Sequence, residues 1–225
     1  MILFFKLLFV HLLTEYPFQT NQIFAYKSKN LKGVALHVSI YLGLALLIAW
    51  PEWKIENSLL LFIFATAAVH LVIDELKNIY IRRTKRDDIY AFLVDQILHV
   101  LTLLALFMFY PVGALNALTA LGSLWTEGDL AFGIGIILST YAASIFIYYV
   151  RKTYFVARVQ YERDYVRMLW RLALYLLWVM QSYLVILAVG CWFVLSAKKQ
   201  KPFKGFQEIN DFIFAAVSYG VTIVL

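Results

Sequence analysis

Long apolar runs alternate with short polar segments along the chain. Crossing a bilayer as an α-helix takes ~17 to 25 apolar residues, and most of the runs are about that long. Proline lies at the end of three of the first four runs, and Asn57 and Ser58 can cap the third. The pattern predicts four membrane helices in the first half, over residues 2–18, 33–50, 57–81 and 89–110.

The second half is less regular. Residues 130–150 form a clear apolar span, residues 151–171 are basic and aromatic as expected of a helix at the membrane surface, and residues 172–196 are apolar again. A basic linker over 197–205 precedes a final apolar stretch over 206–225.

These segments predict an all-α fold, a polytopic transmembrane helix bundle of about six to seven membrane helices plus an interfacial helix. We expect a four-helix domain over residues 1–112 and a second group of transmembrane helices over 113–225. The second-half topology has two solutions: either residues 112–128 cross the membrane or residues 172–196 form a hairpin.

Composition supports a membrane protein over a soluble one. Hydrophobic residues make up 63% of the 225 residues and charged residues only 15%, against a usual quarter. The net charge of +6 could suggest nucleic-acid binding, but the basic residues lie in short loops between apolar runs, so none is expected.

Loop charge predicts the orientation. Residues 19–32 and 82–88 are basic, whereas residues 51–56 carry two Glu and one Lys. Basic loops stay in the cytoplasm, which predicts a multi-pass protein of the bacterial cytoplasmic (inner) membrane with its N-terminus outside. No small-residue cleavage site follows the apolar residues 1–10, so we expect them to remain as part of the first helix.

The four histidines fall one in each of the first four apolar runs, and three of them have a carboxylate four residues away. Residues four apart share one helix face, so each pair can direct an imidazole and a carboxylate at one point. The predicted orientation also places the set at similar depth, roughly 5–15 Å below the cytoplasmic surface. The pairs are His11 with Glu15, His70 with Asp74 and His99 with Asp95, while His37 lacks such a partner.

Ionisable groups in membrane helices cost ~2.5–3.5 kcal/mol each on insertion scales, so the set needs compensation. A divalent transition metal provides it, because imidazole and carboxylate suit zinc, iron or manganese. The seven groups predict a site for one or two ions, with a structural or proton-relay network as the alternative. The predicted ligands are His11, Glu15, His37, His70, Asp74, Asp95 and His99. Gln19 and Gln96 are expected either to support them by hydrogen bonds or to cap helices.

The segments His11-Leu-Leu-Thr-Glu15, His70-Leu-Val-Ile-Asp74 and Asp95-Gln96-Ile-Leu-His99 resemble, with His37-Val, a family of bacterial polytopic membrane proteins. That family is known only as a domain of unknown function, often encoded beside a SatD-type protein. Its pattern usually has Asp at position 15, a second histidine where Tyr41 stands, and a Glu in place of Trp170. A distant similarity to membrane-bound metal-dependent hydrolases implies hydrolysis by analogy.

The function expected from these features is metal-dependent hydrolysis at the cytoplasmic side of the membrane, through a metal-activated water. Glu15 or Asp95 is the expected general base. The substrate would be amphiphilic and enter from the bilayer, or be a small soluble ester. The alternatives are an ion- or proton-coupled transporter and a non-catalytic metal-binding scaffold.

Overall fold

The computed structural model describes residues 2–54, 57–109, 125–155, 161–181, 187, 191 and 202–224. Regular structure in these residues is helical throughout, which confirms the all-α class. The chain divides into two compact units, Met1–Leu130 and Ala131–Leu225, described in turn below. The domain boundary expected at residue 112 lies outside the described residues.

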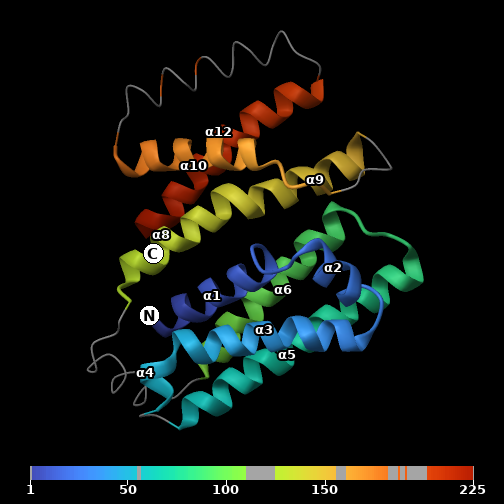
Figure 1. Ribbon diagram of the computed structural model, residues 1–225, viewed down its shortest axis with the longest axis vertical. Helices are drawn as coiled ribbons and strands as arrows, with labels where there is room; N and C mark the ends of the chain where they lie inside the picture. The colour runs from blue at the N-terminus through green and yellow to red at the C-terminus, as the bar shows by residue number, and fades with distance from the viewer. Residues whose placement is uncertain are drawn as a thin grey trace. The chain divides into compact units, whose positions relative to one another are not determined.

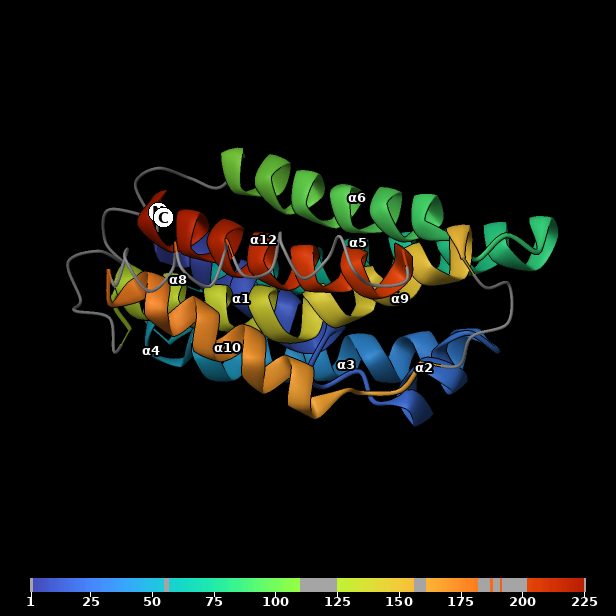
Figure 2. The same cartoon turned by 90° about the horizontal axis from the view of Figure 1, so that it is seen from above.

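The first unit is a ring of four long helices (Figures 1 and 2). Helix α1 packs against α3 and α6, and α5 also packs against α3 and α6, so the ring closes. Two short helices, α2 and α4, accompany α3. Their bounds are α1 Ile2–Glu15, α2 Asn21–Lys27, α3 Leu31–Ile48, α4 Trp50–Trp53, α5 Ser58–Thr84 and α6 Ile89–Met108.

Successive long helices of the ring run in opposite directions (Figure 1). The end of α1, the start of α3, the end of α5 and the start of α6 therefore lie at one end of unit 1. The interior is apolar towards the other end, where Leu7, Val38, Ile63 and Leu103 are buried together. Most buried polar side chains of unit 1 gather instead at the end that the α5–α6 connection closes, whereas the buried ion pair of Lys6 with Glu52 lies at the apolar end.

Helix α2 corrects one prediction, because residues 19–32 were expected to form a loop. The Thr20 hydroxyl accepts a hydrogen bond from the Ile23 amide at 3.3 Å and caps α2. Helix α2 then lies directly on the first turn of α3, where a Cβ on Gly33 would overlap the Tyr26 carbonyl. Glycine at position 33 therefore permits the close approach that fixes α2 in place.

Two further helix ends differ from the prediction. Helix α1 stops at Glu15, three residues early, because Tyr16 and Pro17 form a turn. Helix α5 continues to Thr84, so Arg82 and Arg83 belong to its last turn rather than to a loop. Lys85 takes a left-handed conformation (φ 59°) and ends the helix.

Four helices of the described residues are long and apolar enough to cross a membrane, against six or seven expected. They are Leu31–Ile48, Ser58–Thr84, Ile89–Met108 and Glu127–Tyr154. Helix α1 has 14 residues and a length of about 21 Å, which is shorter than the ~30 Å hydrocarbon core. The chain thus has the helices of a membrane protein.

The helix that enters the second unit runs through α8 (Glu127–Ile137), a π-helical turn (Leu138–Ala142) and α9 (Ala143–Tyr154). Helices α10 (Tyr165–Val179) and α12 (Pro202–Val224) pack against this turn. The single surface helix expected over 151–171 is wrong, because residues 161–164 are not helical. The span expected over 172–196 is also interrupted, because α10 ends at Val179 and Gln181 has a positive φ of 55°.

Arg171 was expected at the membrane surface and is instead buried, with 1% of its surface exposed. Its Nη1 pairs with Asp211 at 2.7 Å, and its Nε donates to the Ser139 carbonyl at 2.9 Å. Arg167 also pairs with Asp211. The π-helical turn frees carbonyl groups, and the guanidinium satisfies them, so this cluster explains how unit 2 tolerates a buried charge.

Candidate metal centre

The seven side chains predicted as metal ligands meet at the polar end of unit 1, and each is at most 5% exposed. Four helices supply these side chains. Residue spacing within one helix can show only which two of them share a face, so the sequence revealed pairs rather than the whole set. Helix α1 contributes His11 and Glu15, α3 contributes His37, α5 contributes His70 and Asp74, and α6 contributes Asp95 and His99.

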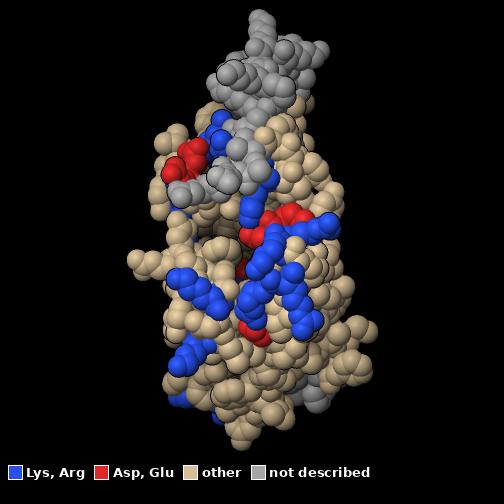
Figure 3. Space-filling model, turned by 90° about the vertical axis from the view of Figure 1, so that its right-hand side faces the viewer, with Lys and Arg blue, Asp and Glu red and all other residues tan. Residues whose placement is uncertain are grey.

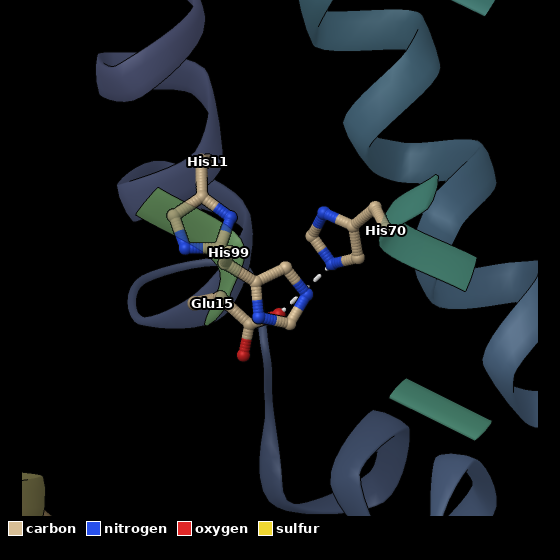
Figure 4. A group of neighbouring side chains, drawn as sticks. All are labelled: His11, Glu15, His70 and His99. Atoms are coloured by element: carbon tan, nitrogen blue, oxygen red, sulfur yellow. Dashed lines mark hydrogen bonds and ion pairs between the residues drawn. The ribbon is translucent and has the colours of Figure 1, made fainter. Parts of the chain in front are cut away.

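Three imidazoles and one carboxylate form the first ligand group (Figure 4). One ligand atom from each of His11, Glu15, His70 and His99 lies within 4.8 Å of the others. The ring centroids of His70 and His99 are 4.4 Å apart, and those of His11 and His99 are 4.8 Å apart. Three His and one Glu are a donor set that suits zinc, iron or manganese.

The hydrogen bonds of this group favour metal binding. His99 Nδ1 lies 2.9 Å from the Asp95 carbonyl oxygen, which can only accept, so Nδ1 carries the proton. In the neutral ring the lone pair is then on Nε2, which has no hydrogen-bond partner among the described residues. His11 Nε2 is likewise without one. A backbone contact that fixes the tautomer and leaves the other nitrogen open is typical of metal-binding histidine.

A second group combines Glu15 and His70 with His37 and Asp74, again within 4.8 Å. His37, the histidine with least support in the sequence, lies 2.8 Å through its Nε2 from Glu15 Oε1. His70 Nε2 lies 3.1 Å from Glu15 and 3.3 Å from Asp74. Both Nε2 atoms therefore face carboxylate acceptors and carry protons that a metal would have to replace. In the first ligand group His70 would lose this proton too, but there His11 and His99 offer open nitrogens, whereas in the second group both imidazoles face carboxylates.

The second group already contains a cation, the ammonium of Lys27. Lys27 Nζ lies 2.8 Å from Asp74 Oδ1 and 3.2 Å from Glu15 Oε1. Burial opposes the charge, but Asp74 and Glu15 outweigh it and raise the pKa of Lys27, which belongs to α2 outside the membrane-length helices. The ammonium thus supplies positive charge at the place where a second metal ion would otherwise bind.

Lys27 is the main residue that sequence reasoning missed. It was interpreted as one of several basic loop residues that set the orientation. Its placement depends on α2, and Asn78 of α5 fixes it further by donating to the Lys27 carbonyl at 2.9 Å. Gln19, predicted to support the site, accepts from Lys27 Nζ at 3.2 Å and donates to the Glu15 carbonyl.

A third group joins Asp74, Asp95 and His99. Lys77 of α5 pairs with Asp95 Oδ2 at 2.7 Å. Gln96, the second predicted supporting residue, donates to the same oxygen at 3.0 Å and accepts from the Tyr16 hydroxyl. Asp95 Oδ1 has no hydrogen-bond partner among the described residues, so this oxygen can accept a proton.

A small cavity of about 20 Å³ opens beside the first ligand group. Its polar lining includes the three imidazoles of that group together with Tyr41, Thr66 and Thr102. Tyr41, at the position where the family pattern has a second histidine, packs its ring 5.0 Å from His70 and donates to Thr66 at 3.2 Å. The volume is about that of one water molecule.

The charges of the cluster leave room for a divalent ion. Glu15, Asp74 and Asp95 bring three negative charges, and Lys27 and Lys77 bring two positive ones. With neutral imidazoles the buried cluster carries one net negative charge, which is costly in a low-dielectric interior. A divalent cation would change this net charge to plus one. The open nitrogen donors that can bind the cation belong to the first ligand group.

The family model described as "Protein of unknown function (DUF3307)" matches residues 3–126, more than half of the chain and all seven predicted ligands. No curated protein and no solved structure matches the chain. The chain belongs to the DUF3307 family.

Proposed function

We propose that this DUF3307 protein is a metal-dependent hydrolase of the cytoplasmic membrane that holds one divalent transition ion on His11, Glu15, His70 and His99. The observation that carries the proposal is the convergence of these four donors from three helices, with the Nε2 atoms of His11 and His99 open. A purely structural network would be expected to pair such buried nitrogens.

A bound zinc, iron or manganese ion supplies Lewis acidity and lowers the pKa of a coordinated water towards neutrality. Asp95 then suits the role of general base better than Glu15. Glu15 Oε1 is shared by Lys27, His37 and His70, whereas Asp95 Oδ1 is open. Lys77 and Gln96 hold the other oxygen of Asp95 and orient the carboxylate.

A second candidate function is proton-coupled transport. The observation that favours it is the pair of lysine–carboxylate contacts in the same buried cluster, Lys27 with Asp74 and Lys77 with Asp95. Chains of such groups at membrane depth can relay protons. Cation or proton flux into proteoliposomes in the absence of ester turnover would favour transport over hydrolysis, and stable metal retention with neither activity would favour a scaffold.

Metal analysis of the purified protein tests the leading proposal. We expect about one equivalent of transition metal, lost in His70→Ala and His99→Ala. Asp95→Asn should keep the metal and lower ester turnover by roughly 10²–10⁴-fold, as expected for a general base. Glu75→Gln is the matched control for metal content, because Glu75 lies beside Asp74 on α5 but pairs with Arg82 outside the cluster. Wild-type protein without metal, or His70→Ala with unchanged metal content, would contradict the proposal.

A further inference from the structure

A pocket of about 240 Å³ opens at the end of unit 1 where α2 meets the last turns of α5. It is distinct from the small cavity beside the imidazoles and about ten times as large. Its polar lining includes three cationic side chains, Lys27, Lys77 and Arg82, and Phe24 and Ile81 form apolar parts of the wall. Figure 3 shows Lys and Arg side chains gathered on one face of the molecule.

The pocket adjoins the metal centre through two of these lysines. Lys27 lines the pocket, and its Nζ contacts Asp74 and Glu15 at 2.8 and 3.2 Å. Lys77 lines it as well, and its Nζ contacts Asp95 at 2.7 Å. The ammonium groups of these two lysines therefore lie between a group bound in the pocket and the carboxylates of the cluster.

The charge of the cluster decides what the pocket can bind. With neutral imidazoles, a divalent ion on the first ligand group turns the net charge of the buried cluster from minus one to plus one, and Arg82, paired with Glu75, lies at the rim. Among the lining residues Asp87 alone is acidic. A guanidinium and two ammonium groups around one pocket are the kinds of donor that bind phosphate oxygens. Each of them already contacts a carboxylate, so a phosphate would share Arg82 with Glu75 and share the two lysines with the cluster.

We propose that this pocket binds the phosphate group of the substrate, so that the protein hydrolyses phosphate esters. This inference rests on the proposed hydrolase function and names its substrate class. The phosphate could come from a soluble ester or from a lipid headgroup, and the apolar residues Phe24 and Ile81 leave room for part of an attached organic group.

The reaction balances as the hydrolysis of a phosphate monoester. The oxygen of a water molecule forms a bond to phosphorus, and the bond between phosphorus and the ester oxygen breaks, with its electron pair leaving on that oxygen. Asp95 Oδ1 accepts a proton from the water, and the proton ends on the departing alcohol. The products are an alcohol and inorganic phosphate.

The test compares binding of inorganic phosphate by the full-length, metal-loaded protein in detergent, measured by calorimetry, across three charge variants. Arg82→Gln should weaken phosphate binding roughly tenfold, because it removes one charged donor. Asp87→Asn should tighten it severalfold, because it removes the acidic lining residue. Arg83→Gln is the matched control, since Arg83 is the exposed neighbour on the same turn and does not line the pocket.

Turnover assays distinguish the two sources of phosphate. They also distinguish failure of the phosphate pocket from failure of the proposed hydrolase function. Para-nitrophenyl phosphate reports the soluble ester, and phosphatidic acid in phosphatidylcholine vesicles reports the lipid. We expect Arg82→Gln to raise KM for the phosphate substrate with kcat and metal content unchanged. Hydrolysis of para-nitrophenyl acetate without phosphate binding would overturn this inference and keep the hydrolase. Phosphate binding that is unchanged in Arg82→Gln and in Asp87→Asn would also overturn this inference. Absence of metal from the purified protein would refute the hydrolase function itself.

Discussion

Replacing Lys27 with methionine tests whether its ammonium takes the place of a second metal ion. Methionine keeps the length and flexibility of the side chain and removes the charge. In the second ligand group Glu15 and Asp74 would then face each other without a cation, beside His37 and His70. We expect Lys27→Met to bind two equivalents of transition metal where the wild type binds one.

The magnitude follows from the two contacts of the ammonium. At 2.8 and 3.2 Å from Asp74 and Glu15, an effective dielectric constant of about 20 gives roughly 5–6 kcal/mol of Coulomb attraction for each contact. Much of this is offset by the desolvation of Lys27, which is 5% exposed. Removing one partner of a buried ion pair typically costs ~3–5 kcal/mol, so the metal-free variant should lose about that much stability.

The assay combines elemental analysis of the purified protein with thermal unfolding at rising zinc concentration, in phosphate-free buffer. The loss of stability should shrink as zinc occupies the new site, because a ligand that binds only the folded state stabilises it. Lys29→Met, at an exposed position two residues away, should change neither the metal content nor the thermal stability. A Lys27→Met protein that is less stable yet binds no additional metal would refute the idea that the ammonium and an ion compete for one place.

Three further changes have defined outcomes. His99→Ala removes an open nitrogen donor and should weaken metal binding by at least about 100-fold in a competition titration with a chelator, with the helical circular dichroism retained. Gly33→Ala forces α2 away from α3 and should lower the free energy of unfolding by roughly 1–3 kcal/mol, whereas Gly43→Ala on the same helix meets open space and should not. Asp211→Asn removes the charge that pairs with the buried Arg171 and should cost ~3–5 kcal/mol, against less than about 1 kcal/mol for Asp164→Asn, which keeps a capping oxygen for α10 and loses only a 3.7 Å ion pair with Arg167.

The sequence could predict the four long helices of unit 1 and the side chains that they bring together, because apolar length and helix-face spacing are local signals. His11 and Glu15 share a face of α1, and His70 and Asp74 share a face of α5, whatever surrounds them. The common depth of the pairs followed from loop charge. These signals identify which side chains meet, and they also place His37 near the set although no carboxylate accompanies it on α3.

What the sequence could not show depends on packing between helices. Lys27 enters the cluster because Gly33 lets α2 lie against α3, and neither residue carries a pattern that predicts this contact. The sequence around Lys77 likewise carries no pattern that marks its partner. Its actual partner, Asp95, belongs to another helix. In unit 2 the burial of Arg171 depends on Asp211, 40 residues away, and on a π-helical turn that no composition signal marks.

The π-helical turn at Leu138–Ala142 determines how this helix responds to a change in its length. Such a turn is the product of one inserted residue in an otherwise regular α-helix, and each residue of a regular helix advances about 100° around the axis. Because the wider turn takes up the extra residue, deleting a single residue here would restore regular winding and leave the faces of α8 and α9 in register. The deletion would instead remove the open carbonyls of Ser139 and Thr140 that accept from Arg171, so its cost should fall on the buried guanidinium rather than on the packing of α9.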